Sequence, residues 1–246
     1  MTFIEHIEEL RNRFLIVLGA WVVGSGIAFV FRGRLLTWLK NAIPSPADVE
    51  VISTRLLEPF MVSMQTAAFA GLLFASPVVL GQVWGFIAPG LYKQERRWAA
   101  PFVLMSMIAF IGGTMFARYL VLPFALPILL GFLGPTVTTF LSIGDYISKM
   151  LLYMTVFGFL FEMPVLGFVL ARIGLVRADL LTRYRRHAIV IGAILAALIT
   201  PTGDPVNFLL VAGPLVVLYE ITILIVRISQ RKVKDDKSNR GFTSPD

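Results

Sequence analysis

Long apolar runs recur along the chain and constrain its fold more than any other feature. Six segments are assigned as membrane spans, at residues 14–31, 60–87, 98–117, 146–171, 188–200 and 206–226. A helix needs about 20 apolar residues to cross roughly 30 Å of hydrocarbon, whereas the strands of a membrane barrel alternate over about 10 residues. Because 57% of the 246 residues are hydrophobic and only 15% are charged, the sequence predicts an all-α integral membrane protein.

The distribution of basic residues predicts how many spans there are. Residues 119–135 are apolar enough to compete as a seventh span, but their prolines and glycines make a poor uninterrupted helix. With six spans, 16 of the 22 Lys and Arg residues lie on one side, as expected of cytoplasmic loops. A seventh span would reverse that bias. The sequence therefore predicts six spans and both termini in the cytoplasm. It also predicts an external loop over residues 119–145, which could include a helix lying on the surface, with Arg118 extending toward the outer interface.

The end of the chain differs from the rest. Residues 188–200 and the run 206–218 each hold about 13 residues, which cover only about 20 Å as helix. We therefore expect short fifth and sixth spans. Residues 1–228 are assigned to one membrane domain and residues 229–246 to a basic, disordered cytoplasmic tail. The remaining basic residues are spread over short loops, which argues against nucleic-acid binding.

Two acidic residues are predicted at the cytoplasmic interface. Glu9 precedes the first span and Glu95 lies in the loop between the second and third. Glu9 can form an ordinary helix pair with Arg13, four residues on, and Glu95 can be neutralised by its arginine neighbours. The alternative is that both carboxylates are held at the interface to bind a cation.

Glu162 lies inside the fourth span, at hydrocarbon depth. A charged group there costs about 2.5–3.5 kcal/mol on insertion scales and usually marks function, although a protonated structural glutamate stays possible. Pro164 is expected to kink this helix and to leave the carbonyl near Leu160 without its helical donor. One hypothesis from Glu162 alone is a small proton-coupled solute transporter.

No enzymatic machinery is visible in the sequence. The chain has no cysteine, and His6 and His187 have no partner at metal-ligand spacing. No nucleophile–base pair or phosphate-binding loop is present. We therefore predict no enzyme activity, no metal site and no cofactor.

Several motifs resemble one family, the TatC subunits of the twin-arginine protein translocase. They run in order along nearly the whole chain, as HIEELRNR (6–13), QVWGFIAPGLYKQERR (82–97), FGFLFEMPV (157–165), RRHAIVIGAILAALITPTGDP (185–205) and PLVVLYE (214–220). The resemblance implies a glove-like, concave bundle in the bacterial cytoplasmic (inner) membrane. It also implies a receptor for twin-arginine signal peptides, which moves folded proteins with the proton motive force.

The resemblance also implies roles for particular residues. It places Glu9, Glu95 and Phe86 in the site for the signal-peptide arginines, where Arg11 and Arg97 would orient the carboxylates. It places Glu162 on the concave face. Single-span TatA or TatB partners would dock near the fifth and sixth spans, and the receptor complex is expected to contain several copies of the chain in contact with lipid. The residues implied in partner docking are Ala197, Leu198, Thr200 and Asp204.

The turn after the fifth span departs from one common form of the family pattern. TPTGDP carries one more residue than a TPPD turn, and Asn207 or Phe208 stands where a glutamine is often found. On its own terms, Asp204 is also suited to capping the sixth span.

Overall fold

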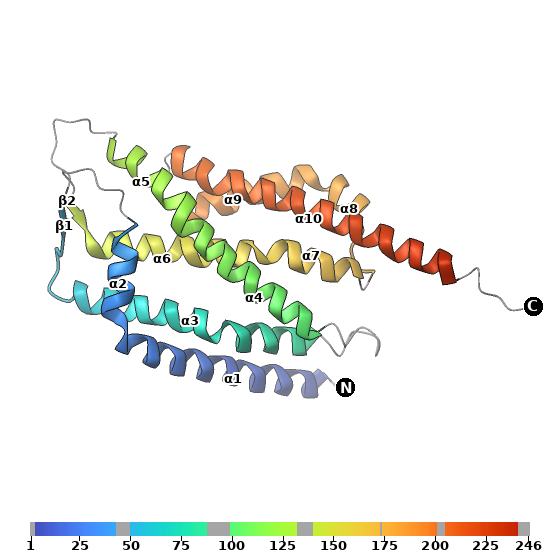
Figure 1. The fold of residues 1–246 in the computed structure, drawn as a ribbon, viewed down its shortest axis with the longest axis horizontal. Coiled ribbons are helices and arrows are strands. Elements are labelled where there is room, and N and C mark those ends of the chain that lie inside the picture. Colours follow the sequence, from blue (N-terminus) through green and yellow to red (C-terminus); the bar gives the residue numbers. More distant parts are fainter. Residues whose placement is uncertain are drawn as a thin grey trace, which may run out of the picture. The chain divides into compact units, whose positions relative to one another are not determined.

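The computed structural model describes residues 3–42, 50–87, 99–131, 140–172, 174–200 and 205–240. Contacts between Cα atoms divide the chain into two compact units, Met1–Gly158 and Phe159–Asp246. The described residues are helical apart from short connections and one pair of strands (Figure 1). This confirms the predicted all-α class.

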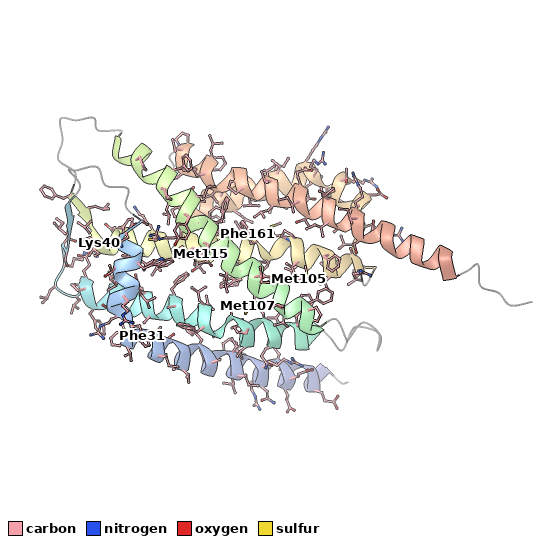
Figure 2. All side chains as sticks on the ribbon, viewed as in Figure 1. Phe31, Lys40, Met105, Met107, Met115 and Phe161 are labelled. Carbon is pink, nitrogen blue, oxygen red and sulfur yellow. The ribbon has the colours of Figure 1, made fainter. Side chains whose placement is uncertain are left out.

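Nine elements lie wholly or mostly in the described residues of the first unit. Figure 2 labels Phe31, in the turn that links the first two helices, and Lys40, the last residue of the second. The elements are α1 (Phe3–Val30), α2 (Arg32–Lys40), β1 (Glu50–Ile52), α3 (Glu58–Ile87), α4 (Ala99–Phe116), the π-helix η3 (Ala117–Val121), α5 (Leu122–Gly131), β2 (Phe140–Ser142) and α6 (Ile143–Leu160).

Small residues let α1 and α3 lie side by side (Figure 1). A Cβ added to Gly71 of α3 would come within 2.5 Å of the Ser25 backbone nitrogen on α1, and one added to Gly24 would come within 2.9 Å of the Gly71 carbonyl oxygen. Close approach through small residues is how helices pack where lipid supplies no hydrophobic drive. The Trp21 indole also donates to the Ala68 carbonyl, at 2.8 Å.

α3 contains Pro77, which has no N–H to donate to the Leu73 carbonyl one turn earlier. The Ser76 hydroxyl donates to that carbonyl instead, at 2.7 Å. Because Ser76 is buried and water does not reach it, this bond gives the Leu73 carbonyl a donor that it would otherwise lack. The apolar run of α3 therefore continues as one helix of 30 residues.

The third span is longer than the sequence predicts. The helix runs from α4 through η3 into α5, with the Leu122 N–H bonded to the Ala117 carbonyl in a π-type turn. This wider turn comes directly before Pro123, which cannot donate in a regular helix. Residues 119–131 are therefore helical. The candidate span reaches Ala125, so the prediction that residues 119–125 belong to the external loop is wrong, whereas a helix at residues 126–131 is compatible with it. Residues 132–139 lie outside the described part.

Arg118 is also placed differently from the prediction. It lies in the π-type turn and is only 5% exposed, rather than extended to an interface. Its Nη2 donates to the Trp38 carbonyl at 2.8 Å, and its guanidinium lies over the Trp38 and Tyr119 rings. These contacts tie the end of α2 to η3.

The two strands form a short parallel pair, with Val51 opposite Leu141. They are joined by the carboxylate of Glu58, the first residue of α3. Its Oε1 accepts bonds from the Ser142 hydroxyl and the Gly144 N–H, at 2.5 and 2.7 Å, and its Oε2 accepts bonds from the loop at residues 53–55. The loop before α3, the end of β2 and the first turn of α6 therefore share one buried anion.

The second unit consists of α7 (Glu162–Arg172), α8 (Ala178–Arg183), α9 (Arg185–Ile199) and α10 (Pro205–Arg240). Gly167 of α7 packs closely on Thr222 of α10. The Gln230 side chain accepts from the Ala178 N–H and donates to the Val176 carbonyl, at 3.3 and 3.2 Å. α10 thus packs against α7 and holds the start of α8.

The predicted interruption of the fourth span is confirmed. The helix stops at Leu160 and α7 starts at Glu162, with a turn at Phe161. Pro164 explains the break, because it has no N–H for the Leu160 carbonyl.

Five helices in the described residues are long and apolar enough to cross a membrane. The predicted fifth span corresponds to α9, which has only 15 residues and is not among them. The predicted sixth span is not short, because the apolar run of α10 extends over 26 residues, Pro205–Gln230. α10 also continues to Arg240, so residues 229–240 are helical where the sequence predicts a disordered tail. After Pro214, no glycine or proline interrupts α10 before Gly241.

Candidate functional site

The N-terminal end of α1 carries an acidic pocket within the first unit. It is open and has a volume of about 490 Å³. Among the described residues, its charged lining consists of three carboxylates, Glu5, Glu8 and Glu9, and one guanidinium, Arg13. The other described lining residues are Asn12, Ile16 and Gln82. The charges of these lining residues sum to an excess of two negative charges, which favours a cationic ligand.

Glu9 forms an ion pair with Arg13, one turn later on α1. Arg13 donates through Nε and Nη2 to Glu9 Oε1, at 3.1 and 2.5 Å. Both side chains are 22% exposed, so the pair lies at the pocket wall rather than in bulk solvent. The ordinary pairing that the sequence allows for Glu9 is therefore present, in addition to its place in the pocket.

The third donor of Arg13 reaches a different helix. Its Nη1 donates to the Gln82 carbonyl of α3, at 3.0 Å. The close packing of α1 on α3 brings these residues together although 69 positions separate them. The sequence predicts neither Arg13 nor Gln82 as part of the site. The four-residue spacing to Glu9 was the only signal for Arg13.

Four predicted site residues are close in sequence to residues of this pocket but are not among its described lining residues. Arg11 is exposed on α1, and Phe86 is half-buried on α3, one turn after Gln82. Trp84, which lies between Gln82 and Phe86 in the sequence, is buried and stacks on Phe102 with ring centroids 5.4 Å apart. Glu95 and Arg97 lie outside the described residues, so their position relative to Glu9 stays a prediction.

Glu162 begins α7 in the second unit and is 7% exposed. It lies within the candidate span Ile143–Arg172, which agrees with the predicted placement inside the fourth span. Whether it faces a concave surface stays a prediction.

The residues predicted for partner docking are partly described. Ala197 and Leu198 are exposed on α9, and Leu198 is 73% exposed. Thr200 is buried, and its hydroxyl donates to the Ala196 carbonyl at 2.7 Å. Asp204 lies outside the described residues.

The same helix lines an apolar pocket of about 180 Å³ within the second unit, together with α7 and α10. Ile189, Ile191, Ile194 and Leu195 are also exposed along α9. α9 therefore presents a largely apolar surface. Among the described residues, no cluster of His, Asp or Glu could hold a metal ion.

Comparison with known proteins identifies the family. The family described as "TatC: Sec-independent protein translocase protein (TatC)" matches residues 5–214. The Sec-independent protein translocase protein TatC of Deinococcus radiodurans is 40% identical over 229 residues, which cover 91% of this chain and 85% of that protein. The corresponding protein of Aquifex aeolicus is 40% identical over 239 residues, covering 96% and 98%.

A solved structure agrees. A crystal structure of a twin-arginine translocase receptor, TatC, superposes with a TM-score of 0.83 at 38% identity, covering 92% of this chain and 99% of that one. The relationship extends from the acidic end of α1 into α10. This chain therefore belongs to the TatC family of Sec-independent protein translocase proteins.

Proposed function

We propose that this chain is the signal-receiving subunit of a twin-arginine translocase and that its acidic pocket binds the signal-peptide arginines. Membership of the TatC family supports Sec-independent protein translocation as its function. The observation that supports the site is the pocket at α1, where three carboxylates face one guanidinium among the described lining residues. Glu95, with Phe86 and Arg97 near it in sequence, is proposed to complete the site.

The chemistry of arginine suits such a pocket. A guanidinium is a planar fork that can bind a carboxylate through two parallel bonds, whereas lysine presents a single point charge. A charge-assisted bond contributes about 1.5–3 kcal/mol, so the loss of one contact should weaken binding about ten- to a hundredfold. Two carboxylates, Glu9 and Glu95, would read a pair of arginines.

Binding of a signal peptide to site variants tests this function. A cross-linkable peptide with paired arginines should label the full chain in native membranes, and its twin-lysine version should label it far less. Glu9→Gln and Glu95→Ala should each remove most of the labelling. Glu220→Gln is the matched control, because Glu220 pairs with Arg185 in the second unit. Labelling that is unchanged in both site variants would contradict the proposal.

We also propose that single-span subunits of the TatA or TatB type dock on α9. The exposed apolar side chains of this helix, with Leu198 the most exposed, support a surface that another helix can cover. A photo-reactive residue at Leu198 should cross-link to such a subunit in native membranes. Cross-links to lipid alone would contradict this docking site.

The rival hypothesis, a proton-coupled solute transporter that uses Glu162, is not favoured. The family match covers Glu162 together with the whole α1 pocket, and it indicates a protein translocase. Solute flux catalysed by the purified chain in liposomes would be the result that revives the rival.

A further inference from the structure

The contacts of Arg13 differ from those of an ordinary pair on a helix surface. An exposed pair four residues apart needs only its own helix and contributes little to stability. Arg13 instead donates through three nitrogens to acceptors on two helices. Nε and Nη2 donate to Glu9 Oε1 on α1, and Nη1 donates to the Gln82 carbonyl on α3. A second attachment on another helix fixes where the guanidinium lies, and hence where the carboxylate that it holds lies.

Gly85 makes room for this arrangement. It lies on α3 three residues after Gln82, and a Cβ placed there would overlap Nη1 of Arg13. Gly81, on the same helix, has nothing within 4 Å of an added Cβ. The missing side chain at position 85 therefore leaves a slot that the Arg13 guanidinium occupies. Among the described residues, no neighbouring group occupies the space at position 81.

We propose that Arg13, seated in the slot at Gly85, is a positioning residue that holds the Glu9 carboxylate in a fixed orientation and so lets it distinguish arginine from lysine. The inference rests on the proposed function, because it assumes that Glu9 receives a signal-peptide arginine. A fork with two donors gains over a point charge only when the carboxylate plane is already oriented. A mobile Glu9 would still attract any cation, but would lose the preference.

The experiment measures affinity for two labelled peptides, one with paired arginines and one with paired lysines, on the purified full chain in nanodiscs. Gly85→Ala should weaken binding of the arginine peptide by about tenfold, the cost of ordering one or two side chains on binding. Binding of the lysine peptide should change by less than about threefold, since the charges of the pocket are kept. The ratio of the two affinities therefore falls.

Two kinds of variant separate this role from general damage. Gly81→Ala is the matched control and should leave the ratio unchanged. The overlap at Gly85→Ala involves the end of a flexible side chain rather than backbone, so the helices can keep their positions. Arg13→Gln should lower the ratio by itself, and Arg13→Lys should restore part of it. Gly85→Ala should have no further effect in the Arg13→Gln background, because the residue that it displaces is gone.

Each outcome decides a different question. A wild-type chain that binds both peptides equally, or a Glu9→Gln variant that binds normally, would overturn the proposed function and this inference with it. If wild type prefers arginine and Glu9→Gln loses that preference, an unchanged ratio in Gly85→Ala or in Arg13→Gln overturns the positioning role alone. The positioning role is also overturned if Gly85→Ala lowers the ratio equally in the wild-type chain and in the Arg13→Gln variant.

Discussion

Outside the candidate site, Glu58 accepts several hydrogen bonds from two parts of the described chain. One carboxylate accepts bonds from the loop before α3, from β2 and from the first turn of α6. Hydrogen bonds to a charged acceptor are roughly twice as strong as neutral ones. Glu58 therefore holds the loop before α3 to Ser142 and Gly144, which lie 84 and 86 positions after it in the chain.

We predict that Glu58→Gln loosens the loop before α3 and the junction of β2 with α6. The amide NH₂ group would face donors where an oxygen now accepts, so that several N–H and O–H groups lose their partner. The thermal midpoint in detergent should fall by several degrees, and amide hydrogen exchange should rise at residues 50–57 and 140–145. Asp145→Asn is the control, because Asp145 is exposed nearby. An unchanged exchange pattern would show that Glu58 does not hold the two connections together.

The role of Glu58 could not have been predicted from the sequence, because the donors that bond to its carboxylate approach it only after folding. The same is true of Arg13, whose third contact lies on another helix. Glu9, in contrast, could be predicted, since its position before the first span and its motif are both local features of the sequence. Glu162 could be predicted as well, because an acid within an apolar run is conspicuous without any structure.

At the scale of elements, the pairing of α1 with α3 sets the geometry of the pocket. Gly24 and Gly71 let the backbones approach, and Arg13 and Gln82 meet farther along the same pair of helices. The sequence predicts both helices but not their contact, since no internal repeat or charge pattern marks Gly71.

We predict that Gly71→Ala forces these helices apart. The new methyl group would press on the Ser25 nitrogen and Cα, which are backbone atoms and cannot rotate away. Overpacking of this kind costs about 1–3 kcal/mol. Thermal unfolding in detergent should show the loss. Gly26→Ala on α1 has nothing within 4 Å and should be neutral or slightly stabilising. Equal midpoints for the two variants would mean that close packing at Gly71 contributes nothing.

At the scale of the whole molecule, we propose six spans with both termini in the cytoplasm. The chain has no cysteine, so single cysteines report position without background. Thr136→Cys should react with a membrane-impermeant maleimide added outside cells, since residue 136 lies in the predicted external segment. Ser238→Cys should react only after the membrane is opened. The opposite pattern would reverse the predicted orientation, and labelling of both from outside would mean that the number of spans is odd.

The sequence alone determined that the chain is a helical membrane protein, where most of its spans lie, and where the helix breaks before Pro164. These properties follow from apolar length, charge and backbone chemistry, which act locally. Tertiary structure decided that the third span continues to Ala125, that Glu58 joins the loop before α3 to β2 and α6, and that Arg13 reaches α3. Each of these depends on donors, acceptors or bare backbone brought close by packing, and a linear sequence does not show which of them will meet.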